Sequence, residues 1–164
     1  MPTPAYMTIE GAHQGLITAG AFTKESVGNS YQEGHEDQIL VQAFKHVVFV
    51  PPGAQSGRRQ HGPLMVTKVI DKSSPLINIA LFNGEPLTCC RVEFYRTSAQ
   101  GGQEHYYTMT LDEAVITHAE IVMPHCQDPD KAEYTLMETV HFAYRRITWT
   151  HEVCGTTGID QWRD

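Results

Sequence analysis

The stretch LMETVHFAYRRITWTH, residues 136–151, carries the pattern that decides the fold. Four large apolar or aromatic side chains lie on even positions, namely Leu136, Val140, Phe142 and Tyr144, whereas Ile147 and Trp149 lie on odd positions. A period-2 pattern changes phase in this way when one extra residue enters a strand. We therefore expect a long, bent strand with a bulge near Arg145 and Arg146, of the kind that closes a β-barrel.

Other strand patterns precede this stretch along most of the chain. Residues 39–50 are rich in β-branched and aromatic side chains, and apolar residues alternate with polar ones in residues 64–70. Residues 90–95 alternate as well, and the turn sequence SAQGGQ then separates them from residues 105–111, as in a hairpin. With the further strand pattern of residues 115–123, the chain is predicted to form six or more antiparallel strands.

One helix is expected in the segment that Ser74 opens and Gly84 closes. Ser74 suits the N-cap, Pro75 suits the first helical position, and Gly84 followed by Pro86 ends the pattern. Together these elements predict a mainly β fold, a compact antiparallel β-barrel of two packed sheets with one flanking α-helix. A length of 164 residues fits one domain, residues 1–164, with a single core.

Charge and hydropathy exclude two classes of partner. The net charge of −7 repels phosphate backbones and anionic membrane surfaces, so nucleic acid is not expected to bind. No apolar run approaches the roughly 18 to 20 residues that cross a bilayer, so no integral membrane segment is expected. The start, MPTPAYMTIEG, lacks a basic segment followed by an apolar one. We therefore expect no cleaved secretion signal and folding in the cytoplasm.

Histidine and cysteine residues give only weak signals for chemistry. A mononuclear metal site built from His125, Cys126 and His141 has no supporting spacing, and the segment HED at residues 35–37 lacks the second histidine of a zinc protease motif. The sequence also lacks nucleophile, phosphate-binding and dinucleotide motifs. The residues alone thus predict no catalytic, cofactor or metal site. They leave a small cytosolic β-barrel metalloenzyme and a ligand-binding module as alternatives.

Seven stretches, spread in order over almost the whole chain, share one resemblance. They are YMTIEG (residues 6–11), GLITAGAF (15–22), SVGNSYQEGHEDQILVQAF (26–44), DKSSPL (71–76), FYRTSAQGGQEHYYTMTLDEAVI (94–116), MPHCQDP (123–129) and FAYRRITWTH (142–151). Together they resemble the haemolysin-coregulated protein family, Hcp, the inner-tube subunit of the bacterial type VI secretion system. Because the match spans the chain in order, it is far more specific than any single motif.

The resemblance implies a structural protein and not an enzyme. Members of the family are compact β-barrels that assemble as homohexameric rings, and the rings stack into a hollow tube inside a contractile sheath. A spike protein tips the tube, and the lumen carries small secreted effectors. The tube is present in the cytoplasm before firing and is then secreted to the extracellular space or a target cell without a cleaved signal peptide. The resemblance also implies that no cofactor is needed.

Two loops are the candidate contact sites in such an assembly. The polar stretch of residues 51–63 is long enough to reach the next ring, and residues 26–37, with exposed strand edges, offer polar groups to the neighbouring subunit. The candidate ring-stacking residues are Pro52, Gly53, Gln55, Arg58, Arg59, Gln60 and His61. The candidate subunit-interface residues are Ser30, Tyr31, Gln32, Glu33, His35, Glu36 and Asp37.

Overall fold

Antiparallel strands are the main secondary structure of the computed structural model, which describes residues 3–28, 33–53, 58–131 and 135–161. The strands are β1 (Ala5–Gly11), β2 (Gly15–Leu16), β3 (Ile39–Lys45), β4 (Val48–Phe49), β5 (Gln60–His61), β6 (Leu64–Val69), β7 (Leu87–Thr97), β8 (Gln103–Asp112), β9 (Val115–Val122), β10 (Met137–Ala143), β11 (Arg146–His151) and β12 (Thr156–Gln161). The helices are α1 (Lys24–Val27) and α2 (Ser74–Asn83), with a 3-10 turn at Pro129–Lys131. The expectation of a mainly β, antiparallel fold with few helices is confirmed.

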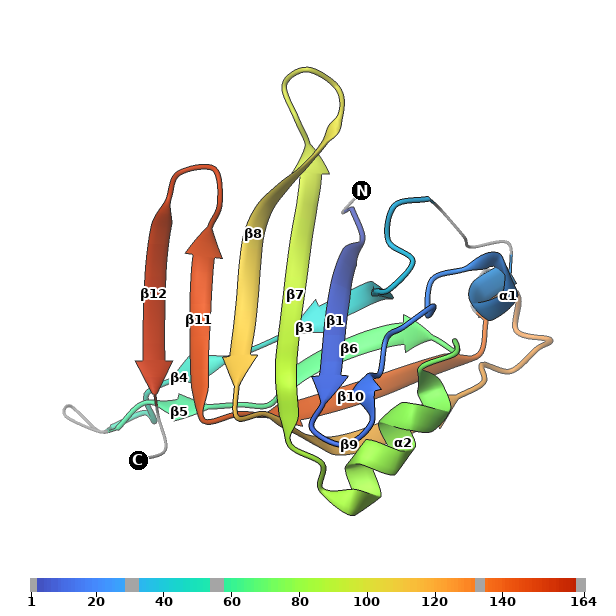
Figure 1. The fold of residues 1–164 in the computed structure, drawn as a ribbon, viewed down its shortest axis with the longest axis horizontal. Helices are drawn as coiled ribbons and strands as arrows, with labels where there is room; N and C mark the ends of the chain where they lie inside the picture. The colour runs from blue at the N-terminus through green and yellow to red at the C-terminus, as the bar shows by residue number, and fades with distance from the viewer. Residues whose placement is uncertain (1–2, 29–32, 54–57, 132–134, 162–164) are drawn as a thin grey trace.

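One sheet is folded into two halves that cross each other. Hydrogen bonds join its strands in the order β12-β11-β8-β7-β1-β3-β6-β10-β9, with β2 paired to β1. In Figure 1 the strands β12, β11, β8, β7 and β1 run side by side, and β3, β6, β10 and β9 run across them. Strands β4 and β5 form a separate hairpin, and α2 packs against β9.

The chain passes between the two halves at two adjacent corners. The first corner joins β8 to β9 through Glu113, whose φ of 51° lies in the left-handed region. The second joins β10 to β11 through Tyr144 and Arg145, and the Arg145 N–H donates to the Asp112 carbonyl at 3.2 Å. Because β8 pairs with β11 and β9 pairs with β10, continuous polypeptide folds the sheet round on itself. The described hydrogen-bond path itself stays open, with β12 and β9 at its ends.

Residues 136–151 change phase as predicted, but they do not form one bulged strand. Phe142 and Tyr144 are buried on even positions, and Ile147 is buried on an odd position. However, β10 and β11 are separate strands, with Tyr144 and Arg145 between them. The expectation of a bulge is therefore wrong. The phase of the pattern changes where the chain turns from one half of the sheet to the other.

Side chains fill the space between the two halves. Met7 and Ile9 of β1, Leu64 of β6 and Phe142 of β10 are fully buried in one cluster with Ile77 of α2. Close packing of this kind is what a small barrel interior requires. A filled interior argues against the alternative of a module that binds a small ligand inside the barrel.

A buried ionic cluster, which we call the Lys68 cluster, fixes the start of α2 against the sheet. It consists of Lys68, Asp71, Ser74 and Glu138. The Lys68 ammonium contacts Glu138 Oε2 at 2.8 Å and Asp71 Oδ1 at 3.2 Å, and it donates to Ser74 Oγ at 3.0 Å. Since the Ser74 hydroxyl also accepts from the Asp71 N–H, it does not cap the helix, and Ser73 is the N-cap residue. The expected cap at Ser74 is therefore wrong by one position.

Candidate assembly surfaces

Three polar side chains, which we call the hairpin clamp, tie the β4–β5 hairpin to β12. They are Arg59, His61 and Asp160. The Arg59 guanidinium donates to both Asp160 carboxylate oxygens at 2.9 Å and to the Gln161 carbonyl at 2.9 Å. His61 Nε2 donates to Asp160 Oδ2 at 2.7 Å. Bidentate charged pairs fix geometry as well as adding energy, so the hairpin and β12 form one continuous surface.

Tyr144 extends the hairpin clamp toward the interior. Its hydroxyl oxygen lies 2.6 Å from His61 Nδ1 and 2.6 Å from His46 Nε2. Because His61 Nε2 donates to Asp160, a neutral His61 accepts the Tyr144 proton at Nδ1. The Tyr144 oxygen then accepts from His46 Nε2. One assignment of protons thus satisfies all four groups.

The surroundings of these groups shift their pKa values. The hydrogen bonds from Arg59, together with the bond from His61, lower the pKa of Asp160 to about 2. Burial lowers the pKa of His46, and the nearby His61 adds to that effect. Burial also raises the pKa of Tyr144. At neutral pH the network therefore contains an ionised Asp160 carboxylate, a neutral His46 and a protonated Tyr144 hydroxyl.

The two ends of the sheet, β12 and β9, are exposed edges. Ile159 of β12 is 63% exposed and Ile121 of β9 is 52% exposed. In Figure 1, β12 and the β4–β5 hairpin lie at the left end of the long axis, and the connection from β9 to β10 lies at the right end. Within the described residues, no further strand pairs with either outer edge. Such edges are templates for pairing with another chain.

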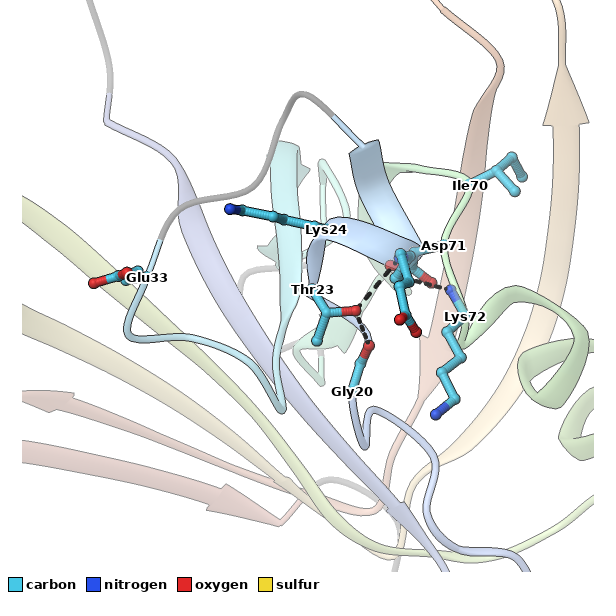
Figure 2. A pocket seen from close by; sticks show the side chains of 9 residues that line it. Gly20, Thr23, Lys24, Glu33, Ile70, Asp71 and Lys72 are labelled. Atoms are coloured by element: carbon cyan, nitrogen blue, oxygen red, sulfur yellow. Dashed lines mark hydrogen bonds between the residues drawn. The ribbon is translucent and has the colours of Figure 1, made fainter.

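A surface hollow of ≈ 880 Å³ lies between α1 and the segment that precedes α2 (Figure 2). The Thr23 hydroxyl accepts from the Ser26 N–H at 3.3 Å, and the Ser26 hydroxyl accepts from the Lys72 N–H at 2.7 Å. The first bond caps α1, and the second connects the two walls of the hollow. Both ammonium and carboxylate groups line it, including Lys24 and Glu33, so it does not select a ligand of one charge.

Comparisons with known proteins identify the family. Residues 6–151 match the family model described as "Type VI secretion system effector, Hcp". The chain belongs to the Hcp family. A Pseudomonas aeruginosa relative, "Major exported protein", is 58% identical over an alignment that covers 99% of this chain and 97% of the relative.

Solved Hcp structures share both the sequence and the fold. "Secreted protein Hcp3 from Pseudomonas aeruginosa" is 54% identical, with a TM-score of 0.86 and 99% of each chain covered. A second structure, "Crystal structure of Hcp protein", is 42% identical, with a TM-score of 0.92 and 98% of each chain covered. The resemblance inferred from the sequence is confirmed, and the chain is a secreted tube protein of the type VI system. In the described ranges, no helix has both the length and the apolar character that crossing a membrane requires.

Membership of the Hcp family, which is structural, removes support from the metalloenzyme alternative. His125 and Cys126 lie exposed in the connection after β9, whereas His141 stacks on His118, with 4.3 Å between ring centroids. In the part of the chain that the structure describes, no group of three or more His, Cys, Asp or Glu side chains is placed to hold a metal ion. The structure therefore does not bring the three proposed ligands together.

The candidate ring-stacking residues fall into three groups. Four are exposed on or near the β4–β5 hairpin: Pro52, Gly53, Arg58 and Gln60. Gln55 lies outside the described residues. Arg59 and His61 belong to the hairpin clamp, and His61 is buried. In this chain those two side chains hold the hairpin in place.

The candidate subunit-interface loop is held on its inner side. His35 stacks on Tyr6, with 3.6 Å between ring centroids, and Asp37 Oδ1 accepts from the Gly20 N–H at 3.0 Å. Glu33 and Glu36 are exposed, and the Gly34 N–H lowers the pKa of Glu36. Three other candidates lie outside the described residues: Ser30, Tyr31 and Gln32. The described part of the loop thus presents carboxylates outward.

Proposed function

We propose that six copies of this chain assemble head-to-tail into a ring, and that the rings stack into the hollow tube of the type VI system. The observation that carries this proposal is the pair of exposed edges, β12 and β9, at opposite ends of the hydrogen-bonded strand order. A ring closes through a heterologous contact that joins one surface of each subunit to a different surface of the next. Two unlike edges at opposite ends supply the two sides of that contact.

The two loops have separate roles in this assembly. The exposed loop residues Pro52 and Gly53 contact the next ring along the tube axis. The carboxylates of Glu33 and Glu36 lie at the border between subunits of one ring. Hairpins and loops carry contacts of this kind because they project from a rigid scaffold.

The assembled tube accounts for the partners and the location of the chain. The protein folds in the cytoplasm as one domain, surrounds small effectors in its lumen, and meets a spike protein at the tip and a contractile sheath outside. Firing then carries it into the extracellular space or a target cell. The net charge of −7 supports protein partners rather than nucleic acid.

Native mass spectrometry with negative-stain images of the same purified sample tests this proposal. The expected result is a particle of six chains with an open centre. A monomer that persists at millimolar concentration, at both low and high salt, would contradict it.

A further inference from the structure

Two groups of exposed apolar side chains lie at opposite ends of the molecule. The first, the hairpin patch, consists of Val47, Val48, Phe49 and Val50. The second, the turn patch, consists of Ile121, Val122, Met123 and Leu136, of which Met123 is 70% exposed. A contiguous group of exposed apolar side chains often marks an interaction site, whereas single exposed apolar residues are common on any surface.

Each patch continues into an exposed strand edge. The hairpin clamp joins the hairpin to β12, so the hairpin patch and β12 belong to one surface. The turn patch includes the last two residues of β9, and Val122 pairs with Met137 next to Leu136. Strand β4, which contains Val48 and Phe49, lies at the left end in Figure 1, and the β9–β10 connection lies at the right end.

The charges around the two patches are of opposite sign. Lys45 and Arg58 are exposed beside the hairpin patch, while Asp160 on that side is already bound by the hairpin clamp. Glu120 and Asp130 are exposed beside the turn patch. Asp128 adds a partly exposed carboxylate there. The basic groups on that side, among the described residues, are Lys131, His125 and His118, and His118 Nε2 lies 3.3 Å from Glu120 Oε2. Complementary charge of this kind fixes which surfaces meet and speeds their encounter.

We propose that the hairpin patch of one copy binds the turn patch of the next copy, with Lys45 and Arg58 facing Glu120 and Asp130. This inference rests on the proposed ring, and it names the residues that form the contact between neighbouring subunits. The occupant of each patch is a second copy of this chain, because the two patches match each other in apolar character and are opposite in charge. Their positions at opposite ends make the contact heterologous, as ring closure requires.

Two charge-reversed variants test the pairing. The hairpin-reversed variant carries Lys45→Glu with Arg58→Glu, and the turn-reversed variant carries Glu120→Lys with Asp130→Lys. In a ring built from one variant alone, the hairpin patch and the turn patch carry charges of the same sign. In a ring where the two variants alternate, the two patches carry opposite charges at every contact. A matched control for the hairpin-reversed variant, Arg91→Glu with Arg96→Glu on β7, makes the same change in net charge as that variant, away from both patches.

The readout is native mass spectrometry at 50 mM and 500 mM salt, with circular dichroism to show that each variant is folded. We expect the ring population of each reversed variant, measured alone at low salt, to fall at least tenfold below that of the wild type. The control should form rings as the wild type does. The mixture should form rings that contain three chains of each variant. If the wild type forms rings and the separate variants form them equally well, this pairing is wrong while the ring stands. A mixture that stays monomeric while the wild type forms rings also overturns the pairing. A wild type without rings would instead overturn the proposed function.

Discussion

Two ionic networks hold this chain together, and they differ in burial and in what they connect. The Lys68 cluster is fully buried and joins β6, β10 and α2. The hairpin clamp lies near the surface and joins a hairpin to an edge strand, with the Arg59 side chain 41% exposed. A broken pair in the first leaves a charge in the core, whereas a broken pair in the second leaves a charge in water. We infer that breaking the first network lowers the stability of the whole fold, whereas breaking the second mainly releases the hairpin from its position.

Removal of Lys68 is expected to have the largest effect. Lys68→Ala leaves Glu138 and Asp71 buried without their cation, and it lowers the free energy of unfolding by about 3–5 kcal/mol in urea titrations. Glu138 Oε1 already lacks a hydrogen-bond partner among the described groups, so no spare contact offsets the loss. The matched control is Lys68→Met with Asp71→Asn and Glu138→Leu, which removes all three charges and is expected to lose less stability than Lys68→Ala does. A loss below about 1 kcal/mol for Lys68→Ala would contradict the comparison.

Removal of Asp160 is expected to act locally. Asp160→Asn removes the carboxylate charge but keeps a side-chain oxygen that can accept from the buried His61, while the partly exposed Arg59 turns to water. The free energy of unfolding therefore falls by only about 1 kcal/mol. Amide hydrogen exchange in β5 and β12 accelerates by roughly tenfold because the hairpin separates from the edge. Exchange that rises equally throughout the sheet would show that the hairpin clamp supports the whole fold.

Acid is expected to loosen the hairpin. His46 has a folded pKa below its ordinary value, so the unfolded or opened chain binds the proton more readily. The stability that neutral His46 contributes is therefore fully present above a pH of about 6.5, and it is lost as the pH falls through the folded pKa. Asp160, with a pKa of about 2, stays ionised throughout this range. Exchange in β5, corrected for intrinsic rates, should rise between pH 7 and pH 5, and His46→Gln should abolish that rise.

The smallest expected effects come from substituting two neighbouring arginines, Arg58 and Arg59. Arg59 belongs to the hairpin clamp, whereas Arg58 is exposed beside it. Arg58→Gln should leave the free energy of unfolding within about 0.5 kcal/mol and exchange in β12 unchanged. Arg59→Gln should accelerate exchange in β12 as Asp160→Asn does. Equal exchange in the two arginine variants would remove the distinction between an anchoring and a contact residue.

The alternation of apolar and polar residues predicted which strand faces point inward. The same alternation also indicated a buried ion pair that the sequence analysis did not identify. Leu64 and Val66 are buried as their phase indicates, and the same phase turns Lys68 inward. Glu138 shares the inward phase of Val140 and lies directly opposite Lys68 on the neighbouring strand. Two inward charges of opposite sign on different strands therefore pointed to a buried pair.

The hairpin clamp had no such signal. His61 and Asp160 are 99 positions apart, and His46 and Tyr144 are 98 apart. Only the folding of the sheet brings them together, so no spacing rule finds them. Helix α2 was predictable because Pro75 and Gly84 act locally, and Gly84 does end it in a left-handed conformation, with φ of 60°. The contact roles of residues 26–37 and 51–63 stay predictions, because they depend on a second copy of the chain.

Amide hydrogen exchange in the assembled particle, compared with the hairpin-reversed variant as a folded monomer, tests the central claim most directly. The account predicts that assembly protects two separate segments, β12 with the β4–β5 hairpin and β9 with its connection to β10, while the outer face of β7 stays unchanged. Protection confined to one of these segments, or spread evenly over the surface, would contradict a contact between two unlike ends of the molecule.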